Sequence, residues 1–167
     1  MTKFEVKVKD WINTFEDFES LNSVITKLST DKSVVYTYGV WDLLHPGHIR
    51  LLARAKNLGD FLVVGVVSDS PVAELKGEDR PVQNQNERLI NVGSLRFVDA
   101  AIPQKEYDPS SELRNLFRVN ILTKGDDWEY IPGVETVEEL GGRLIKLGYS
   151  ESFSTSKIVK KINTNNE

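Results

Sequence analysis

Four short apolar runs, rich in β-branched residues, constrain the fold of this chain more than any other feature. They are VVYTYGVW at 34–41, FLVVGVV at 61–67, VNILTKG at 119–125 and RLIKLGY at 143–149, and FVDAAIP at 97–103 is a plausible fifth. Their hydrophobicity is continuous rather than alternating, which is typical of strands that are covered on both faces. The runs therefore predict the strands of a mostly parallel sheet.

Patterns typical of helices separate these runs. Residues 46–58 carry apolar side chains at helical spacing, and residues 84–95 and roughly 110–118 show comparable patterns. A further amphipathic helix is predicted at about 15–28, ahead of the first strand, and a last one at about 155–162. Strands that alternate with helices imply right-handed crossovers, so the chain predicts a doubly wound α/β fold.

Composition limits the class of protein. A length of 167 residues with 40% hydrophobic content suits a single domain over residues 1–167, in which 1–32 form an N-terminal extension with a helix and 163–167 a frayed tail. The net charge of −4 argues against binding to nucleic acid. Because the sequence has no cysteine, no signal-peptide segment and no apolar run long enough to cross a bilayer, we expect a cytoplasmic protein without a membrane partner.

The only two histidines of the chain lie where the first apolar run gives way to a helical pattern. Pro46 suits the first turn of that helix, which places His45 and His48 at the carboxyl end of a strand and the amino end of a helix. In an open α/β sheet this is the ligand crevice, and the helix terminus favours an anion. Both imidazoles could donate hydrogen bonds to phosphate oxygens during phosphoryl or nucleotidyl transfer, while Gly39 would let a ligand approach the backbone.

A single histidine at the start of a helix is more often a cap or a surface residue than a catalyst. Here, however, the string Gly-x-x-Asp-x-x-His-x-Gly-His at 39–48 coincides with the change from strand to helix. We therefore favour the functional interpretation. Asp42 has a structural alternative, in which it hydrogen-bonds the turn.

The string GVWDLLHPGH resembles the GxFDxxHxGH signature, with its HxGH motif, of the cytidylyltransferase-like nucleotidyltransferases. Trp41 stands where that family usually has Phe. The resemblance implies a compact Rossmann-like domain with a five-stranded sheet, in which a substrate phosphate attacks the α-phosphate of a nucleoside triphosphate and releases pyrophosphate. It also implies that the nucleotide is bound by Gly39, Val40, Trp41, Asp42 and Gly47.

A second cluster of cations follows the second apolar run. Charged loops are usually only solvated, but this one is predicted to emerge at the same edge of the sheet as the histidines. The stretch from Leu75 to Arg88 resembles the LKGxxRPVxxxxER segment of the heptose 1-phosphate adenylyltransferases. By that resemblance Lys76 and Arg88 join the two histidines as catalytic phosphate ligands, and Arg80 is a weaker candidate.

The sequence KGDDW follows the fourth run, at 124–128. A turn with one capping aspartate explains it equally well, and adjacent side chains of an extended chain point apart, so joint metal chelation is not expected. GDDW is similar to the glycerol-3-phosphate cytidylyltransferases, whereas the heptose enzymes tend to carry KGGDY. By resemblance Asp126 and Trp128 border the base, but the hybrid leaves both the base and the acceptor open.

The last motif is FSTS at 153–156, ahead of the final helical pattern. A serine or threonine there is first of all an N-cap, and such a helix terminus also binds phosphate. The run resembles the ISTT motif of the family, so Ser154, Thr155 and Ser156 are expected to bind the nucleotide. The Arg and Gly of the family's RTEGISTT are replaced by Tyr149 and Ser152, so the contact made by that Arg is not carried over.

Three hypotheses follow from these motifs. GDDW favours a CTP-using enzyme of the cytidylyltransferase type that acts on a small phosphorylated polyol or sugar, and this is the hypothesis that we prefer. LKGEDRPV favours an ATP-dependent enzyme of the heptose 1-phosphate adenylyltransferase type. The third is a nucleotide-binding module without turnover. For an enzyme we expect a homodimer, and Mg²⁺ held mainly by the oxygens of the triphosphate rather than by protein ligands.

Overall fold

A computed structural model describes residues 12–126, 128–148 and 153–164. Its centre is one five-stranded sheet in the order β3-β2-β1-β4-β5, and all neighbouring strands are parallel. The strands are β1 (Val34–Gly39), β2 (Phe61–Val67), β3 (Ala100–Gln104), β4 (Ile121–Gly125) and β5 (Arg143–Leu147). The doubly wound, Rossmann-like α/β fold is confirmed, including the less certain strand at 97–103.

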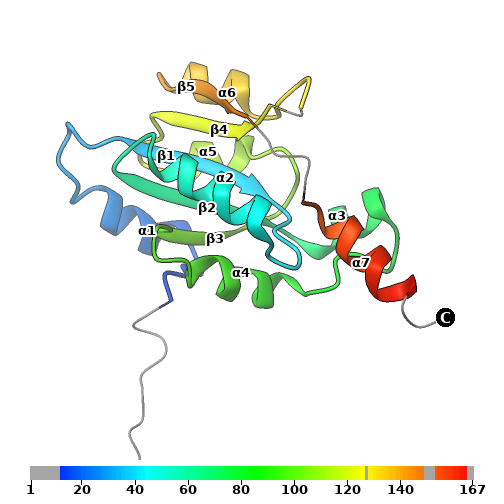
Figure 1. Cartoon of the computed structure of the whole chain (residues 1–167). Coiled ribbons are helices and arrows are strands. Elements are labelled where there is room, and N and C mark those ends of the chain that lie inside the picture. The colour runs from blue at the N-terminus through cyan, green and yellow to red at the C-terminus, as the bar shows by residue number, and fades with distance from the viewer. Residues whose placement is uncertain (1–11, 127, 149–152, 165–167) are drawn as a thin grey trace, which may run out of the picture.

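Helices cover both faces of this sheet (Figure 1). The helices of the described chain are α1 (Phe18–Ile25), α2 (Pro46–Lys56), α3 (Asp69–Lys76), α4 (Gln85–Gly93), α5 (Ser110–Asn115), α6 (Val134–Glu139) and α7 (Thr155–Thr164). One core cluster joins α2 and α4 to the sheet, and the other joins α1, α5 and α6 to its opposite face. None of the described helices is long and apolar enough to cross a membrane.

The helix of the N-terminal extension is part of the core. Leu21 and Ile25 on α1 are fully buried against the sheet. Burial of two such aliphatic side chains contributes about 3–6 kcal/mol to the free energy of unfolding. The N-cap Asp17 accepts a hydrogen bond from the Ser20 backbone N–H and starts the helix later than residue 15. The extension therefore stabilises the domain.

The structure differs from the predicted elements at several boundaries. Helices α3 and α6 were not expected, since α6 has six residues and α3 carries a proline in its first turn. Strand β1 ends at Gly39 rather than at 41, because Trp41 and Leu43 adopt φ values of 59° and 48° and turn the chain toward α2. The predicted tail begins too early, as residues 163 and 164 complete α7 and 165–167 lie outside the described residues.

The strand order places the ligand crevice. From β1 the chain builds the sheet outward to β2 and β3, and it then returns to the other side of β1 for β4 and β5. The order thus reverses between β1 and β4. The carboxyl ends of these two strands form the switch point at which open α/β sheets bind ligands.

Candidate active site

A pocket opens at the carboxyl ends of β1 and β4, where the switch point lies. Its wall also includes residues from α2, α3, the loop after β3 and the start of α7. The predicted site residues that line it are Gly39, Val40, Trp41, Asp42, His48, Lys76, Trp128 and Thr155, joined by Arg80. The other three sequence motifs therefore converge with the histidine motif on one pocket.

His45 is the N-cap of α2. Its Nδ1 accepts a hydrogen bond from the Gly47 backbone N–H at 3.2 Å, and the residue is only 3% exposed. A Cβ atom on Gly47 would lie 2.9 Å from the His45 ring, so only glycine leaves room for this cap. The rings of His45 and His48 stack with 3.7 Å between their centroids. His45 thus caps the helix and supports His48 rather than lining the pocket itself.

His48 is a neutral imidazole at neutral pH. Burial, followed by the nearby His45 and Lys76, lowers its pKa from 6.5 to about 3, and Asp42 opposes that shift only weakly. Burial also lowers the pKa of His45. Within the described residues, the buried Nδ1 of His48 has no hydrogen-bond partner. His48 can therefore offer a hydrogen bond to a ligand without the cost of desolvating a charge.

The buried Trp41 indole packs against His48. Its Nε1–H donates a hydrogen bond to the Gly65 carbonyl at 3.0 Å, and its ring meets the His48 ring edge-on at 5.4 Å. A Cβ atom on Gly39 would lie 3.0 Å from the indole. The space beside Gly39, which we expected to admit a ligand, is therefore occupied on that side by Trp41.

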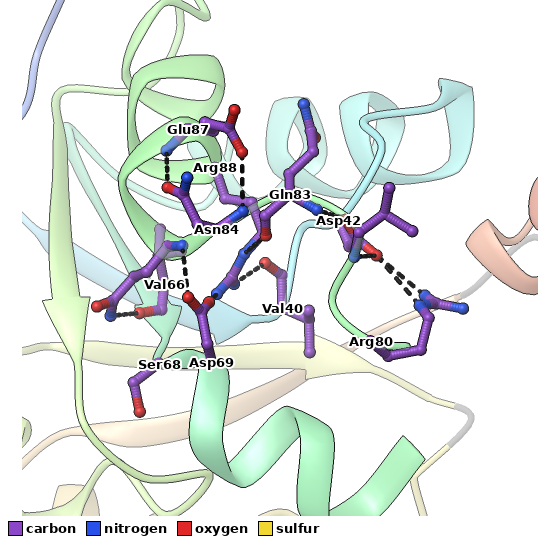
Figure 2. Close-up of polar contacts among 12 residues, drawn as sticks. Val40, Asp42, Val66, Ser68, Asp69, Arg80, Gln83, Asn84, Glu87 and Arg88 are labelled. Carbon is purple, nitrogen blue, oxygen red and sulfur yellow. Dashed lines mark hydrogen bonds and ion pairs between the residues drawn. The ribbon is translucent and has the colours of Figure 1, made fainter. Parts of the chain in front are cut away.

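Asp42 has the structural role that we considered as an alternative, because its carboxylate accepts hydrogen bonds from the backbone. The carboxylate is 1% exposed and accepts hydrogen bonds from the Val82 and Gln83 backbone N–H groups, each at 3.0 Å (Figure 2). It also forms an ion pair with Arg80, whose Nη2 lies 3.1 Å away. This buried carboxylate ties the loop after β1 to the loop before α4. It also holds Arg80 at the pocket wall.

Arg88 does not lie where a phosphate in the pocket would contact it, contrary to our expectation. Its side chain is fully buried and donates hydrogen bonds to the carbonyls of Val40 and Gln83, at 2.6 and 2.9 Å, and to the Asp69 carboxylate (Figure 2). Arg88 lies on the face of α4 that also buries Leu89 and Val92 against the sheet. Arg88 therefore supports the loop after β1 from behind.

Lys76 reaches the pocket from the last residue of α3. Burial of the ammonium group lowers its pKa, and the positive charge of Arg80 lowers it further, while Asp42 opposes the shift. Lys76 and Arg80 thus form a pair of cations beside His48. Anionic oxygens in the pocket would neutralise both charges.

Lys124, at the end of β4, belongs to the site although the sequence motifs did not predict it there. Lys124 is 6% exposed and lines the pocket, and its Nζ donates a hydrogen bond to the Tyr38 carbonyl at 2.6 Å. The ammonium lies 3.6 Å from the Tyr38 ring centroid and 4.9 Å from that of Trp128. A lysine at the end of an otherwise apolar strand was the available signal. Asp126, by contrast, does not line the pocket.

The residues of the FSTS motif lie in different environments and have different contacts. Thr155 lines the pocket, and its Oγ1 donates a hydrogen bond to the Asp42 carbonyl at 2.8 Å. Ser154 accepts a hydrogen bond from the Lys157 backbone N–H, which is the expected N-cap. Ser156 lines a separate groove beside Arg80. Tyr149 and Ser152 lie outside the described residues.

The donors in the pocket wall do not form a site for a metal held by the protein. Among the described residues no group of three or more histidines, cysteines or carboxylates could hold a metal ion. Asp42, an acidic residue of the wall, is already engaged by Arg80 and two backbone N–H groups. The side chains that line the pocket are better suited to an anion than to a cation.

Comparison with known proteins gives consistent results. A family model described as cytidylyltransferase-like matches residues 36–161. The protein named bifunctional protein HldE is 37% identical in Aliarcobacter butzleri, over 92% of this chain and 31% of that protein, and 38% identical in Salmonella arizonae, over 89% and 31%. The chain thus spans about a third of the length of these curated relatives.

Two solved structures resemble the fold. The lipopolysaccharide core biosynthesis protein from Thermoplasma volcanium has a TM-score of 0.61 and 30% identity, and the match covers 72% of this chain and 99% of that one. A pantoate–β-alanine ligase from Francisella tularensis has a TM-score of 0.62 but 14% identity, over 93% of this chain and 78% of that one. The second likeness concerns the fold alone.

Proposed function

Because this chain belongs to the cytidylyltransferase-like family and is a nucleotidyltransferase, we propose that it transfers AMP from ATP to the phosphate of a sugar 1-phosphate. Heptose 1-phosphate is the first acceptor to test. The observation that carries the proposal is the placement of neutral His48, Lys76 and Arg80 around one pocket at the N-terminus of α2. A triphosphate and a sugar phosphate are both anions, and this wall is built to receive anions.

In the proposed reaction an acceptor phosphate oxygen attacks the α-phosphorus of the nucleotide. The bond from that phosphorus to the bridging oxygen breaks, and pyrophosphate leaves with the electron pair. His48 would donate a hydrogen bond to the α-phosphate, whose charge is redistributed as the bonds change. Lys76 and Arg80 would supply positive charge to the leaving pyrophosphate and to the attacking phosphate. The chemistry needs no covalent intermediate on the enzyme.

The relatives favour ATP over the CTP that we first preferred. The stretch from Leu75 to Arg88 resembles the heptose 1-phosphate adenylyltransferases, and the curated relatives, at 37% and 38% identity, are HldE proteins. The solved relative is named for the biosynthesis of a lipopolysaccharide core, a sugar structure, which fits a sugar phosphate better than a polyol phosphate. CTP with glycerol 3-phosphate stays a second candidate because of GDDW at 125–128.

We also propose that the enzyme uses Mg²⁺, forms a homodimer and is cytoplasmic. Since the pocket offers no cluster of carboxylates among the described residues, Mg²⁺ would enter with the nucleotide and screen the charge of the triphosphate. A homodimer and a cytoplasmic location are proposed from the family resemblance and from the absence of cysteine. Sedimentation at several protein concentrations would test the dimer.

A pyrophosphate-release assay tests the proposed function. Each of ATP, CTP, GTP and UTP is combined with heptose 1-phosphate and with glycerol 3-phosphate in the presence of Mg²⁺. We expect turnover with ATP and heptose 1-phosphate. Pyrophosphate release only with CTP would select the second candidate. Nucleotide binding without pyrophosphate release in any combination would indicate the nucleotide-binding module without turnover. His48→Ala serves as the negative control.

A further inference from the structure

Tyr107 places a phenol hydroxyl in the pocket wall for which neither the sequence motifs nor the proposed mechanism gives a role. The residue lies in the loop between β3 and α5 and lines the pocket together with Arg80. Its Oη is buried, and in the part of the chain that the structure describes it has no hydrogen-bond partner. A buried hydroxyl left without a partner is costly unless a ligand satisfies it.

The backbone that carries Tyr107 is fixed by a buried network. Gln104, fully buried at the end of β3, donates from Nε2 to the Glu106 carbonyl at 2.7 Å and to the Tyr107 carbonyl at 3.4 Å. The Oε1 of Gln104 accepts a hydrogen bond from the buried Tyr36 hydroxyl at 2.8 Å. The Glu112 carboxylate accepts one from the Lys105 N–H at 3.1 Å. The phenol is therefore presented from a rigid support, as a binding residue requires.

The surroundings of Tyr107 indicate the chemistry of its ligand. Burial raises the pKa of the phenol, and the nearby Arg88 and Arg80 oppose that shift, so the hydroxyl is protonated at neutral pH and close to positive charge. Arg80 shares the pocket wall with it, whereas Arg88 is fully occupied by its own partners. A hydrogen-bond donor beside a guanidinium suits a phosphate oxygen.

The phosphate oxygen could belong to the nucleotide or to the acceptor, and the position of Tyr107 relative to the sheet favours the acceptor. Tyr107 follows β3, whereas Lys124 lies at the end of β4 and Trp128 follows it, and β2 and β1 lie between these strands. Since the base is expected beside Trp128 and the α-phosphate beside His48, the side of the pocket near β3 is left for the acceptor. Resting on the function proposed above, we propose that the Tyr107 hydroxyl donates a hydrogen bond to the phosphate of the acceptor substrate, beside Arg80.

The test is Tyr107→Phe, which removes only the hydroxyl. We expect the KM for heptose 1-phosphate to rise about 10-fold, because a hydrogen bond to a charged group is lost. The KM for ATP and the midpoint of thermal unfolding should stay unchanged, since the hydroxyl makes no hydrogen bond within the described protein. The matched control is Tyr130→Phe, whose hydroxyl donates to the surface residue Glu135 at 3.0 Å and lies outside the pocket. It should change neither KM.

Other results would overturn the inference. An unchanged acceptor KM would show that the hydroxyl does not bind the acceptor, and a rise confined to the KM for ATP would assign it to the triphosphate. If the wild type released no pyrophosphate from any substrate pair, the proposed function would fail. Calorimetric titration of wild type and Tyr107→Phe with heptose 1-phosphate then decides the inference separately, and equal affinity, or no binding to either protein, would overturn it.

Discussion

The loop from Gly39 to His48 and helix α7 meet at the same pocket, but they are held in different ways. The loop is fixed by buried contacts, among them those of Asp42 with Arg80 and of Arg88 with Val40. Helix α7 contains no buried residue, and its Thr155 donates a hydrogen bond to the Asp42 carbonyl. In Figure 1 it lies outside the two helix layers. The difference indicates a preformed frame around the chemistry, by which we mean residues 39–48 and their buried contacts, and a less firmly held helix that contributes Thr155 to the pocket wall.

The largest expected effect is the loss of the frame in Asp42→Ala. The substitution leaves Arg80 and the Val82 and Gln83 N–H groups without their shared acceptor. Breaking such a buried pair costs about 3–5 kcal/mol in the free energy of unfolding, which urea titration measures. The control Glu139→Ala removes an exposed ion pair with Arg114 and should leave stability nearly unchanged. Equal stabilities of the two variants would contradict the proposed rigidity of the loop.

The next effect concerns chemistry rather than stability. His48→Gln keeps a polar side chain but removes the imidazole, and we expect kcat to fall about 10²–10³-fold, as for the loss of one donor to a developing charge. Circular dichroism should show an intact fold. A kcat within twofold of the wild type would mean that the frame does not position a reacting group.

A smaller effect should appear in the pH dependence of stability. Because the folded-state pKa of His48 is lowered to about 3, the unfolded chain binds a proton below pH 6.5 and the folded chain does not. The wild type should therefore lose up to about 1.4 kcal/mol per pH unit relative to His48→Gln as the pH falls from 6.5 toward 4.5. Urea titrations at several pH values give this difference. A constant difference would show that His48 is not buried in the frame.

The smallest effect is expected on α7. Thr155→Val removes the hydrogen bond to the Asp42 carbonyl, worth about 1 kcal/mol. Since α7 contains no buried residue, the free energy of global unfolding should barely change, while amide exchange in residues 155–164 becomes faster and the KM for the nucleotide rises severalfold. The control Ser156→Ala lies on a separate groove and should behave like the wild type. A large loss of global stability in Thr155→Val would show that α7 belongs to the frame.

The sequence could predict the strands of the sheet, but not the direction of the charged side chains near the pocket. Continuous apolar runs report burial on both faces of a sheet, so the strands and the placement of His48 were predictable. The direction of a charged side chain is not encoded in this periodicity. Arg88 was therefore expected at a phosphate, whereas it lies on the buried face of α4 and donates to the Val40 carbonyl. Asp42 was left between two roles, which only the distances to Val82 and Gln83 separate.

Residues outside the motifs were harder to predict. Lys124 ends an apolar strand, and its place between two aromatic rings depends on contacts with residues that are distant in sequence. Tyr107 lies in a loop without periodicity, and its backbone is held by Gln104, which in turn accepts a hydrogen bond from Tyr36. Such positions follow from tertiary packing, which a pattern along the chain does not contain.

The placement of the tryptophans also gives the protein an optical reporter. Trp41 is 3% exposed and hydrogen-bonded, so its fluorescence should be blue-shifted and shielded from iodide. Trp128 lines the pocket beside the Lys124 ammonium, where a stacked base would quench its emission. With Trp11 and Trp41 both replaced by phenylalanine, titration with a nucleotide would thus follow occupancy of the pocket through the intrinsic fluorescence of Trp128.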